Sequence, residues 1–272
     1  MELISSHQLM ILLPGLFCIA FVFSMFGRGG GEFILPLLIS VLSLPFFNLA
    51  TISLFLIFSQ GVVMLLVYGG KHKLVDWPLA LSLAIIVGTF AFAGGYLSFH
   101  VKPIYLKGIF AVVLLISAYK IWQGKKVPAK KGRFGTWHRK LPGEEGEEYD
   151  MNFLYIVLPV ALIAGVAGML GISGCGLIMP ICILLGGVPM RIAIGSNTLL
   201  VLTSSGTSFL GHIARGHYPP WSYILMFAGA TIIGALLGSR THVKIRDEYV
   251  KKGFITILIV AAVWMVVKIY LK

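Results

Sequence analysis

The chain has 272 residues, of which 58% are hydrophobic and only 12% are charged, and its mean hydropathy is +0.93. Soluble domains carry roughly 25% charged residues, so this composition excludes an ordinary soluble enzyme or binding domain. The formal net charge is +12, but the basic residues lie in short connections between apolar runs, where Lys and Arg set membrane topology. We therefore expect no nucleic-acid partner.

Apolar runs near the length of roughly 20 residues that crosses a bilayer as a helix recur along nearly the whole chain. Continuous runs favour α-helices over a β-barrel, whose strands alternate in hydrophobicity. The second and seventh runs are short and each contains two prolines, so we expect them to be broken, tilted or partly re-entrant. The ten segments are 8–27, 32–47, 49–69, 76–98, 103–122, 152–171, 175–188, 192–213, 219–239 and 250–271.

These segments predict an all-α, multi-pass protein of the plasma or inner membrane, in contact with lipid. One long polar connection, residues 123–151, separates a first membrane repeat (1–122) from a second (152–272). The connection is basic in its first part and acidic in its second, which is typical of a solvated linker. A regulatory tail or a contact with lipid head groups are the alternatives.

The two membrane halves repeat each other at an offset of 144 residues. With the basic linker placed in the cytoplasm, ten crossings put both termini outside and give each half five crossings. An odd number of crossings makes the two halves inverted repeats. The matched pairs include Gly27 with Gly171, Gly30 with Gly174, Pro36 with Pro180, Pro45 with Pro189 and Trp77 with Trp221.

Each half contains a glycine cluster closed by a proline. The first glycine cluster is residues 27–36 (GRGGGEFILP) and the second is residues 171–180 (GISGCGLIMP). Irregular backbone inside a membrane survives only where it is packed in protein or lines a polar cavity, and broken segments at matching places in two repeats point to a transporter's binding site. The N–H groups at the start of the following helix would cradle an anion. Close helix packing through small residues is the alternative.

The clusters and the polar residues after them supply the candidate site. Ser and Asn donate hydrogen bonds to an oxyanion without adding a charge, although Ser in a helix often bonds only to its own backbone. Arg28 and Glu32 either pair with each other, or Arg28 holds an anion while Glu32 takes up a proton. The expected substrate-binding residues are Gly29, Gly30, Gly31, Ser53, Ser173, Gly174, Cys175, Gly176, Ser196 and Asn197.

The three cysteines lie in apolar segments and show no metal-ligand spacing, so we expect neither a metal nor a cofactor. Gln60, a lone amide in the middle of its segment, is expected to form an interhelical hydrogen bond. The sequence does not indicate an oligomeric state.

The paired motifs, Gly-x-Gly-Gly-Gly…Pro and Gly-x-x-Gly-x-Gly…Pro with Thr/Ser runs downstream, resemble those of the TauE/SafE family of membrane permeases. The resemblance covers nearly the whole chain apart from the linker. It implies export of sulfite or organosulfonates, and it places Gly29–Gly31, Gly174 and Gly176 on the substrate path. Ser173 and Cys175 interrupt a glycine run that is fuller in the family.

We therefore expect a secondary transporter that moves a small anion, such as sulfite, thiosulfate or a sulfonated organic acid, by alternating access around a midplane site between the repeats. A passive anion channel of the same architecture is an alternative. A third hypothesis is an intramembrane protease, because residues 171–174 resemble the Gly-x-Ser-Gly of rhomboid proteases and His212 offers a base. His212 lies at a segment end and lacks the usual oxyanion-stabilising partners, so we expect no enzyme.

Overall fold

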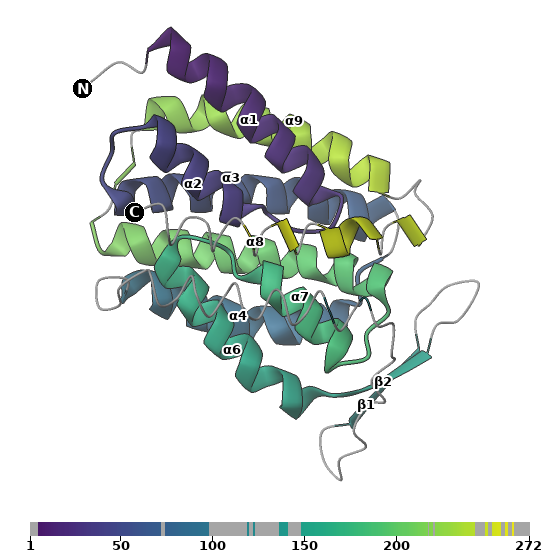
Figure 1. Cartoon of the computed structure of the whole chain (residues 1–272). Coiled ribbons are helices and arrows are strands. Elements are labelled where there is room, and N and C mark those ends of the chain that lie inside the picture. Colours follow the sequence, from purple (N-terminus) through teal and green to yellow (C-terminus); the bar gives the residue numbers. More distant parts are fainter. Residues whose placement is uncertain are drawn as a thin grey trace.

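The computed structural model describes residues 5–71, 74–97, 119, 122, 136–140, 148–216, 218–219, 221–242, 248–249, 252–256, 259–260 and 263. Helices dominate this part of the chain (Figure 1). The elements are α1 (Ser6–Ser24), α2 (Gly31–Val41), α3 (Phe46–Leu65), the π-helical turn η1 (Leu66–Lys71), α4 (Trp77–Tyr96), β1 (Thr136–Lys140), β2 (Glu148–Asn152), α6 (Phe153–Leu170), α7 (Cys175–Leu184), α8 (Met190–Ala214) and α9 (Trp221–His242).

Five of the described helical stretches are long and apolar enough to cross a membrane, which confirms a multi-pass membrane protein. They are Ser6–Ser24, Phe46–Gly70, Trp77–Tyr96, Phe153–Leu170 and Ile224–Thr241. α8 has 25 residues and is long enough as well, but a row of Ser, Thr and Asn lowers its hydropathy. The expected fifth segment and tenth segment lie largely outside the described residues.

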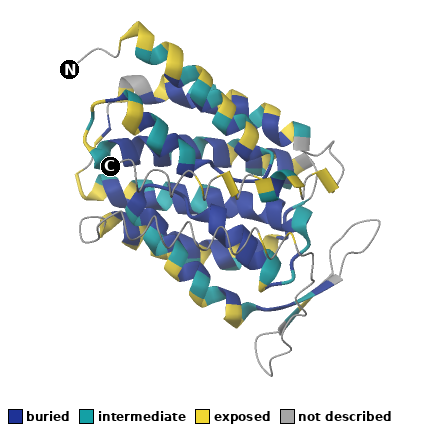
Figure 2. Ribbon diagram, viewed as in Figure 1, coloured by how far each residue is buried: buried dark blue, intermediate teal, exposed yellow. Residues whose placement is uncertain are grey.

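The outer faces of these helices carry large apolar side chains. Met10, Ile85, Leu158 and Leu225 are each more than 60% exposed, and buried residues concentrate between the helices (Figure 2). Apolar surface on this scale is an aggregation hazard in water. Facing lipid, it needs no protein partner.

Matching helices begin at matching positions in the two halves. α2 and α7 start 144 residues apart, and so do α3 and α8, and α4 and α9. Pro45 and Pro189 precede α3 and α8 with nearly identical backbone angles (φ −55°, ψ 141° and φ −56°, ψ 140°). The sequence repeat is therefore a repeat of local structure.

The long-range packing is reciprocal between the halves. α1 packs against α9 of the other half, and α6 packs against α4. Gly238 brings α9 against the carbonyl of Phe21, and Gly94 brings α4 against the carbonyl of Gly165 at the equivalent positions. A side chain at either glycine would collide with backbone, so these contacts hold the two halves together closely.

α3 and α8 cross at the centre of the bundle and run antiparallel (Figure 1). A Cβ on Gly61 would lie 2.9 Å from the Cα of Leu202, and one on Gly206 would lie 2.9 Å from the ring of Phe58. The contacting residue numbers rise along α8 as they fall along α3, so the two helices are antiparallel.

α2 and α7 are the short elements expected for the second and seventh segments. With 11 and 10 residues, each covers only about 16 Å, roughly half of the hydrocarbon core. α2 folds back along α1: a Cβ on Gly30 would lie 2.9 Å from the side chain of Ile19, and a Cβ on Gly15 would lie 2.9 Å from the side chain of Leu37.

The polar connection has more structure than a solvated linker. β1 and β2 pair antiparallel, with basic residues of one strand opposite acidic residues of the other. Trp137 stacks on Phe153 at the start of α6 with ring centroids 4.9 Å apart, and Met151 is fully buried. The hydroxyl of Tyr149 donates to the Asp76 carboxylate at 2.6 Å. Burial of these apolar side chains anchors the hairpin to the bundle, which the charge pattern alone did not reveal.

Candidate functional site

The two glycine clusters follow the same backbone path. In the first, the Arg28 N–H donates to the carbonyl of Phe23 at 3.1 Å, and in the second, the Ile172 N–H donates to the carbonyl of Ala167 at 3.1 Å. These are glycine-terminated helix ends, which require a left-handed residue. The glycines with positive φ here are Gly27 (61°), Gly30 (66°), Gly171 (74°) and Gly174 (67°).

α2 and α7 begin directly after these turns. The N–H groups of Gly31 and Glu32 in α2, and of Cys175 and Gly176 in α7, have no hydrogen-bond acceptor within the described part of the chain. Such groups give a helix start about half a positive charge and favour an anion. These are the two helix starts at which the sequence predicts an anion cradle.

The clusters touch each other. A Cβ on Gly31 would lie 3.3 Å from the Cα of Ile172, and a Cβ on Gly176 would overlap the side chains of Arg28 and Glu32. Because residue 32 is the counterpart of residue 176, equivalent positions of the two halves meet at this contact.

α3 and α8 enclose the clusters from either side. Ala50 contacts Gly171, and Ile57 contacts both Gly29 and Gly31, so one face of α3 borders both clusters. The matching face of α8 borders the first cluster through its contacts with Gly27 and Gly29. The residues of these two faces are Ala50, Ser53 and Ile57 on α3, and Ile194, Asn197 and Val201 on α8.

Arg28 and Glu32 form a buried ion pair. Arg28 Nη2 lies 2.7 Å from Glu32 Oε1, Arg28 is fully buried and Glu32 is 5% exposed. The guanidinium carbon also lies 5.5 Å from the ring centre of Phe23. Pairing was one of the two roles expected for these residues, and it does not use the whole guanidinium: Nε and Nη1 have no hydrogen-bond partner among the described residues.

Gly176 lies directly against this ion pair and leaves room for it. At the counterpart of Arg28 the second half has Ile172, and at the counterpart of Glu32 it has Gly176. The missing side chain on α7 leaves the volume that the carboxylate and guanidinium fill. The buried charges therefore come from the first half, and the space that they fill is left by a glycine of the second half.

The three candidate polar residues after the clusters differ in how they are used. Asn197 Nδ2 donates to the carbonyl of Gly27 at 2.7 Å, and its Oδ1 is buried without a partner. Ser53, its counterpart, has a buried hydroxyl without a partner among the described residues. Ser196 instead accepts a bond from the Asp76 N–H at 2.9 Å, a structural contact at the start of α4.

The remaining candidates lie in the second cluster and are buried. The thiol of Cys175 lies 3.4 Å from the carbonyl of Ser173 and 3.4 Å from the hydroxyl of Ser204 on α8. Gly174 packs against Ala167 of α6. No group of three or more His, Cys, Asp or Glu side chains that could hold a metal occurs among the described residues.

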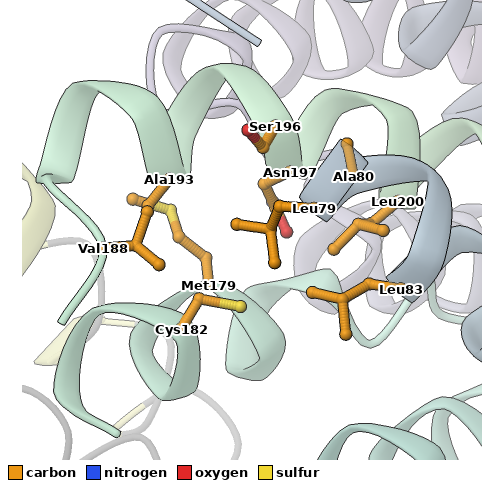
Figure 3. A pocket seen from close by; sticks show the side chains of 10 residues that line it. All are labelled: Leu79, Ala80, Leu83, Met179, Cys182, Val188, Ala193, Ser196, Asn197 and Leu200. Atoms are coloured by element: carbon orange, nitrogen blue, oxygen red, sulfur yellow. The ribbon is translucent and has the colours of Figure 1, made fainter. Parts of the chain in front are cut away.

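A narrow pocket opens beside Asn197, between α4, α7 and α8 (Figure 3). Most of its lining is apolar. Asn197 and Ser196 are its polar exceptions, together with the thiol of Cys182. The lining residues are Leu79, Ala80, Leu83, Met179, Cys182, Val188, Ala193, Ser196, Asn197 and Leu200.

Sequence reasoning missed two polar features near the clusters. Asp76 is buried and joins Tyr149 of the linker hairpin to Ser196 of α8, a link that needs the fold to be seen. Tyr68 and His212 occupy matching positions and contact the carbonyls of the matching residues Ser24 (2.9 Å) and Gly168 (3.1 Å). The offset of 144 residues was the signal that could have revealed the second feature.

Both side-chain polar atoms of Gln60 lack a partner within the described residues, so the expected interhelical bond is absent there.

Comparison with known proteins identifies the family to which this chain belongs. The sequence profile described as "Sulfite exporter TauE/SafE" matches residues 12–265. The chain belongs to the TauE/SafE family. It is a membrane transporter, and the family assignment removes the intramembrane-protease hypothesis. No solved structure matches the chain significantly.

Two curated relatives carry transporter names. The "Probable membrane transporter protein YunE" of Bacillus subtilis is 27% identical over 240 residues, which cover 83% of this chain and 85% of YunE. The "Probable membrane transporter protein MJ0441" of Methanocaldococcus jannaschii is 24% identical over 277 residues, covering 95% of this chain and 97% of that protein. The similarity to both thus extends across the two halves.

Replacing Gly176 by Ala tests whether the ion pair needs the space beside this glycine. The added methyl group would overlap Arg28 and Glu32, and disturbing a buried pair costs about 3 kcal/mol. We expect a lower temperature of thermal unfolding in detergent for Gly176→Ala than for the wild type. The matched control is Gly165→Ala, whose new Cβ has its nearest neighbour 3.7 Å away. Equal unfolding temperatures for the two variants would contradict the described packing.

Proposed function

We propose that this transporter carries a small anion by alternating access, and that the anion binds where the two glycine clusters meet. The observation that carries the proposal is the guanidinium of Arg28, which is fully buried at this contact and has two nitrogen atoms without partners among the described residues. Buried ionisable groups within membrane segments are costly and mark substrate or ion pathways. A fixed positive charge beside two helix starts selects for negative charge.

The architecture we propose is two inverted five-segment repeats. The antiparallel crossing of α3 and α8, the reciprocal packing of α1 with α9 and of α6 with α4, and the matched glycine turns support it. In such transporters the binding site lies near the bilayer midplane at the repeat interface, between broken helices. The contact of the clusters lies between α3 and α8, which supports a site at this interface.

Oxyanion recognition is supported by the groups around Arg28. Ser53 of α3 and Asn197 of α8 flank the clusters. The Ser53 hydroxyl has no partner among the described residues and can rotate to donate. Asn197 Nδ2 uses one N–H for the carbonyl of Gly27, so its second N–H is the one that would donate to an anion. The family description points to sulfite, so we propose sulfite, thiosulfate or a sulfonated organic acid as the substrate class.

In the arrangement described here the clusters are closed by aliphatic side chains. Ile57 packs on Gly29 and Gly31, and Val201 packs on Gly29. We propose that rocking of one repeat against the other separates these contacts and opens the site to one side at a time. The linker, including the hairpin β1–β2, is proposed to lie in the cytoplasm, with both termini outside.

Uptake into proteoliposomes tests this function. We expect flux of labelled sulfite, thiosulfate or sulfoacetate above that of empty liposomes, and saturation of this flux as the concentration of the anion rises. Flux that does not saturate, together with channel-like conductance in planar bilayers, would contradict alternating access. No flux of any of the three anions would contradict the substrate class.

Ser53→Ala separates a binding role from a packing role. The Ser53 hydroxyl has no partner to lose among the described residues, so we expect the unfolding temperature to stay level or rise. Loss of a hydrogen bond to a buried anion should weaken anion binding by about 1 kcal/mol, or roughly fivefold. Ser40→Ala is the matched control, because Ser40 is exposed and bonds only to the carbonyl of Leu37 (2.8 Å) in its own helix. Unchanged affinity in Ser53→Ala would remove this residue from the site.

A further inference from the structure

We propose that Glu32 is an internal competitor of the transported anion for Arg28, and that Glu32 takes up a proton each time an anion displaces it. The proposal rests on the proposed function and deepens it, because it couples anion movement to proton movement and assigns the charge of the substrate. It starts from the geometry of the ion pair.

Glu32 already occupies the place that an anion would take. Its Oε1 is 2.7 Å from Arg28 Nη2, and the carboxylate lies against Gly176 in the first turn of α7. The N–H groups of Cys175 and Gly176, at the start of α7, have no acceptor among the described residues. One carboxylate thus faces both the guanidinium and the positive end of a helix, which are the two features that favour an anion here.

The unused hydrogen-bond donors of Arg28 let an incoming anion compete with Glu32. Nε and Nη1 are buried without partners in the described structure. A guanidinium binds an oxyanion through two parallel N–H groups, and each such pair in Arg28 combines one of the two N–H groups of Nη2 with Nε or with Nη1. Within the described part of the chain, Glu32 accepts one hydrogen bond from this guanidinium, from Nη2. A sulfonate or sulfite group can therefore engage the free edge of Arg28 and then replace the carboxylate.

Charge balance requires a proton in this exchange. In the resting arrangement, one guanidinium cation and one carboxylate anion sum to zero. If a monoanion joined them with Glu32 still ionised, the buried site would carry a net negative charge, which costs several kcal/mol. Transfer of one proton from water to a Glu32 carboxylate oxygen restores neutrality. When the anion leaves, the proton leaves with it and the pair re-forms.

The described surroundings of Glu32 contain few other titratable groups. Arg28 faces it from the turn after α1, and the thiol of Cys175 neighbours it at the start of α7. α3 presents Ile57 to this region, and α8 presents Ser204 through its contact with Cys175. A guanidinium is not a proton acceptor in proteins. Glu32 is therefore the group at this contact whose charge can follow the presence of an anion.

The exchange also defines the preferred substrate as a monoanion. With Glu32 protonated and Arg28 charged, a monoanion leaves the site neutral, whereas a dianion leaves it with one negative charge. We therefore expect methanesulfonate to be transported in preference to 1,2-ethanedisulfonate, although both present the same sulfonate group. Each methanesulfonate ion should enter with one proton.

The test uses the purified full chain, with methanesulfonate as the binding probe and liposomes containing a pH-sensitive dye for transport. For the wild type we expect co-entry of protons and methanesulfonate in a one-to-one ratio. We also expect affinity to fall about tenfold for each unit rise in pH over the range in which one proton binds per anion. Methanesulfonate entry without protons, or binding that does not change with pH, would overturn the coupling and leave the transport function standing. Flux of sulfite, thiosulfate or sulfoacetate without any methanesulfonate binding or flux would overturn the monoanion preference and leave the transport function standing. Absence of flux of all four anions would overturn both.

The substitution Glu32→Gln tests the role of the Glu32 carboxylate. The amide cannot compete as an anion or accept the proton, so we expect methanesulfonate affinity at high pH to rise about tenfold and to become independent of pH. Glu248→Gln is the matched control, since Glu248 pairs with Lys252 at 2.8 Å on an exposed surface; its binding should follow the wild type. Wild-type pH dependence in folded Glu32→Gln would overturn the assignment, and the wild-type proton ratio tests the coupling even if this variant does not fold.

Discussion

The buried pair of Arg28 and Glu32 is the interaction around which the centre of this transporter is arranged. Two charges have been taken out of water between the halves of the bundle, and this is favourable only when their partners are well placed. The chain places them with a left-handed turn before Arg28, a helix start after it, and a glycine on the facing helix. Any side chain at residue 176 would take the space that the pair needs.

The reciprocal packing of the halves explains why this contact is so tightly defined. Each half contributes its first helix to the other half, and close approaches at Gly94 and Gly238 bring the backbones into contact. Because packed membrane helices lack a strong hydrophobic driving force between them, such close packing carries much of the association. The centre is asymmetric: the counterparts of Arg28 and Glu32 in the second half are Ile172 and Gly176. A nearly symmetric scaffold thus supports one chemically unsymmetric site.

Much of this could be predicted from the sequence because the membrane imposes simple rules. The apolar runs gave the helices, and the offset of 144 residues between the halves reappears in the starts of α2 and α7, α3 and α8, and α4 and α9. The glycine-proline spacing located both turns. Serines were harder: Ser196 and Ser53 looked equally able to bind an anion, but only the fold shows that Ser196 is engaged by Asp76. The hairpin β1–β2 was missed because its anchors, Tyr149 and Met151, lie among charged residues whose pattern is that of a solvated linker.

An experimental structure with methanesulfonate bound is the most direct measurement of the central claim. We predict density for the sulfonate group at the Arg28 guanidinium, between the two glycine clusters, with the Glu32 carboxylate withdrawn from Nη2. A sulfonate bound elsewhere in the bundle, with Arg28 and Glu32 still paired as they are here, would contradict it.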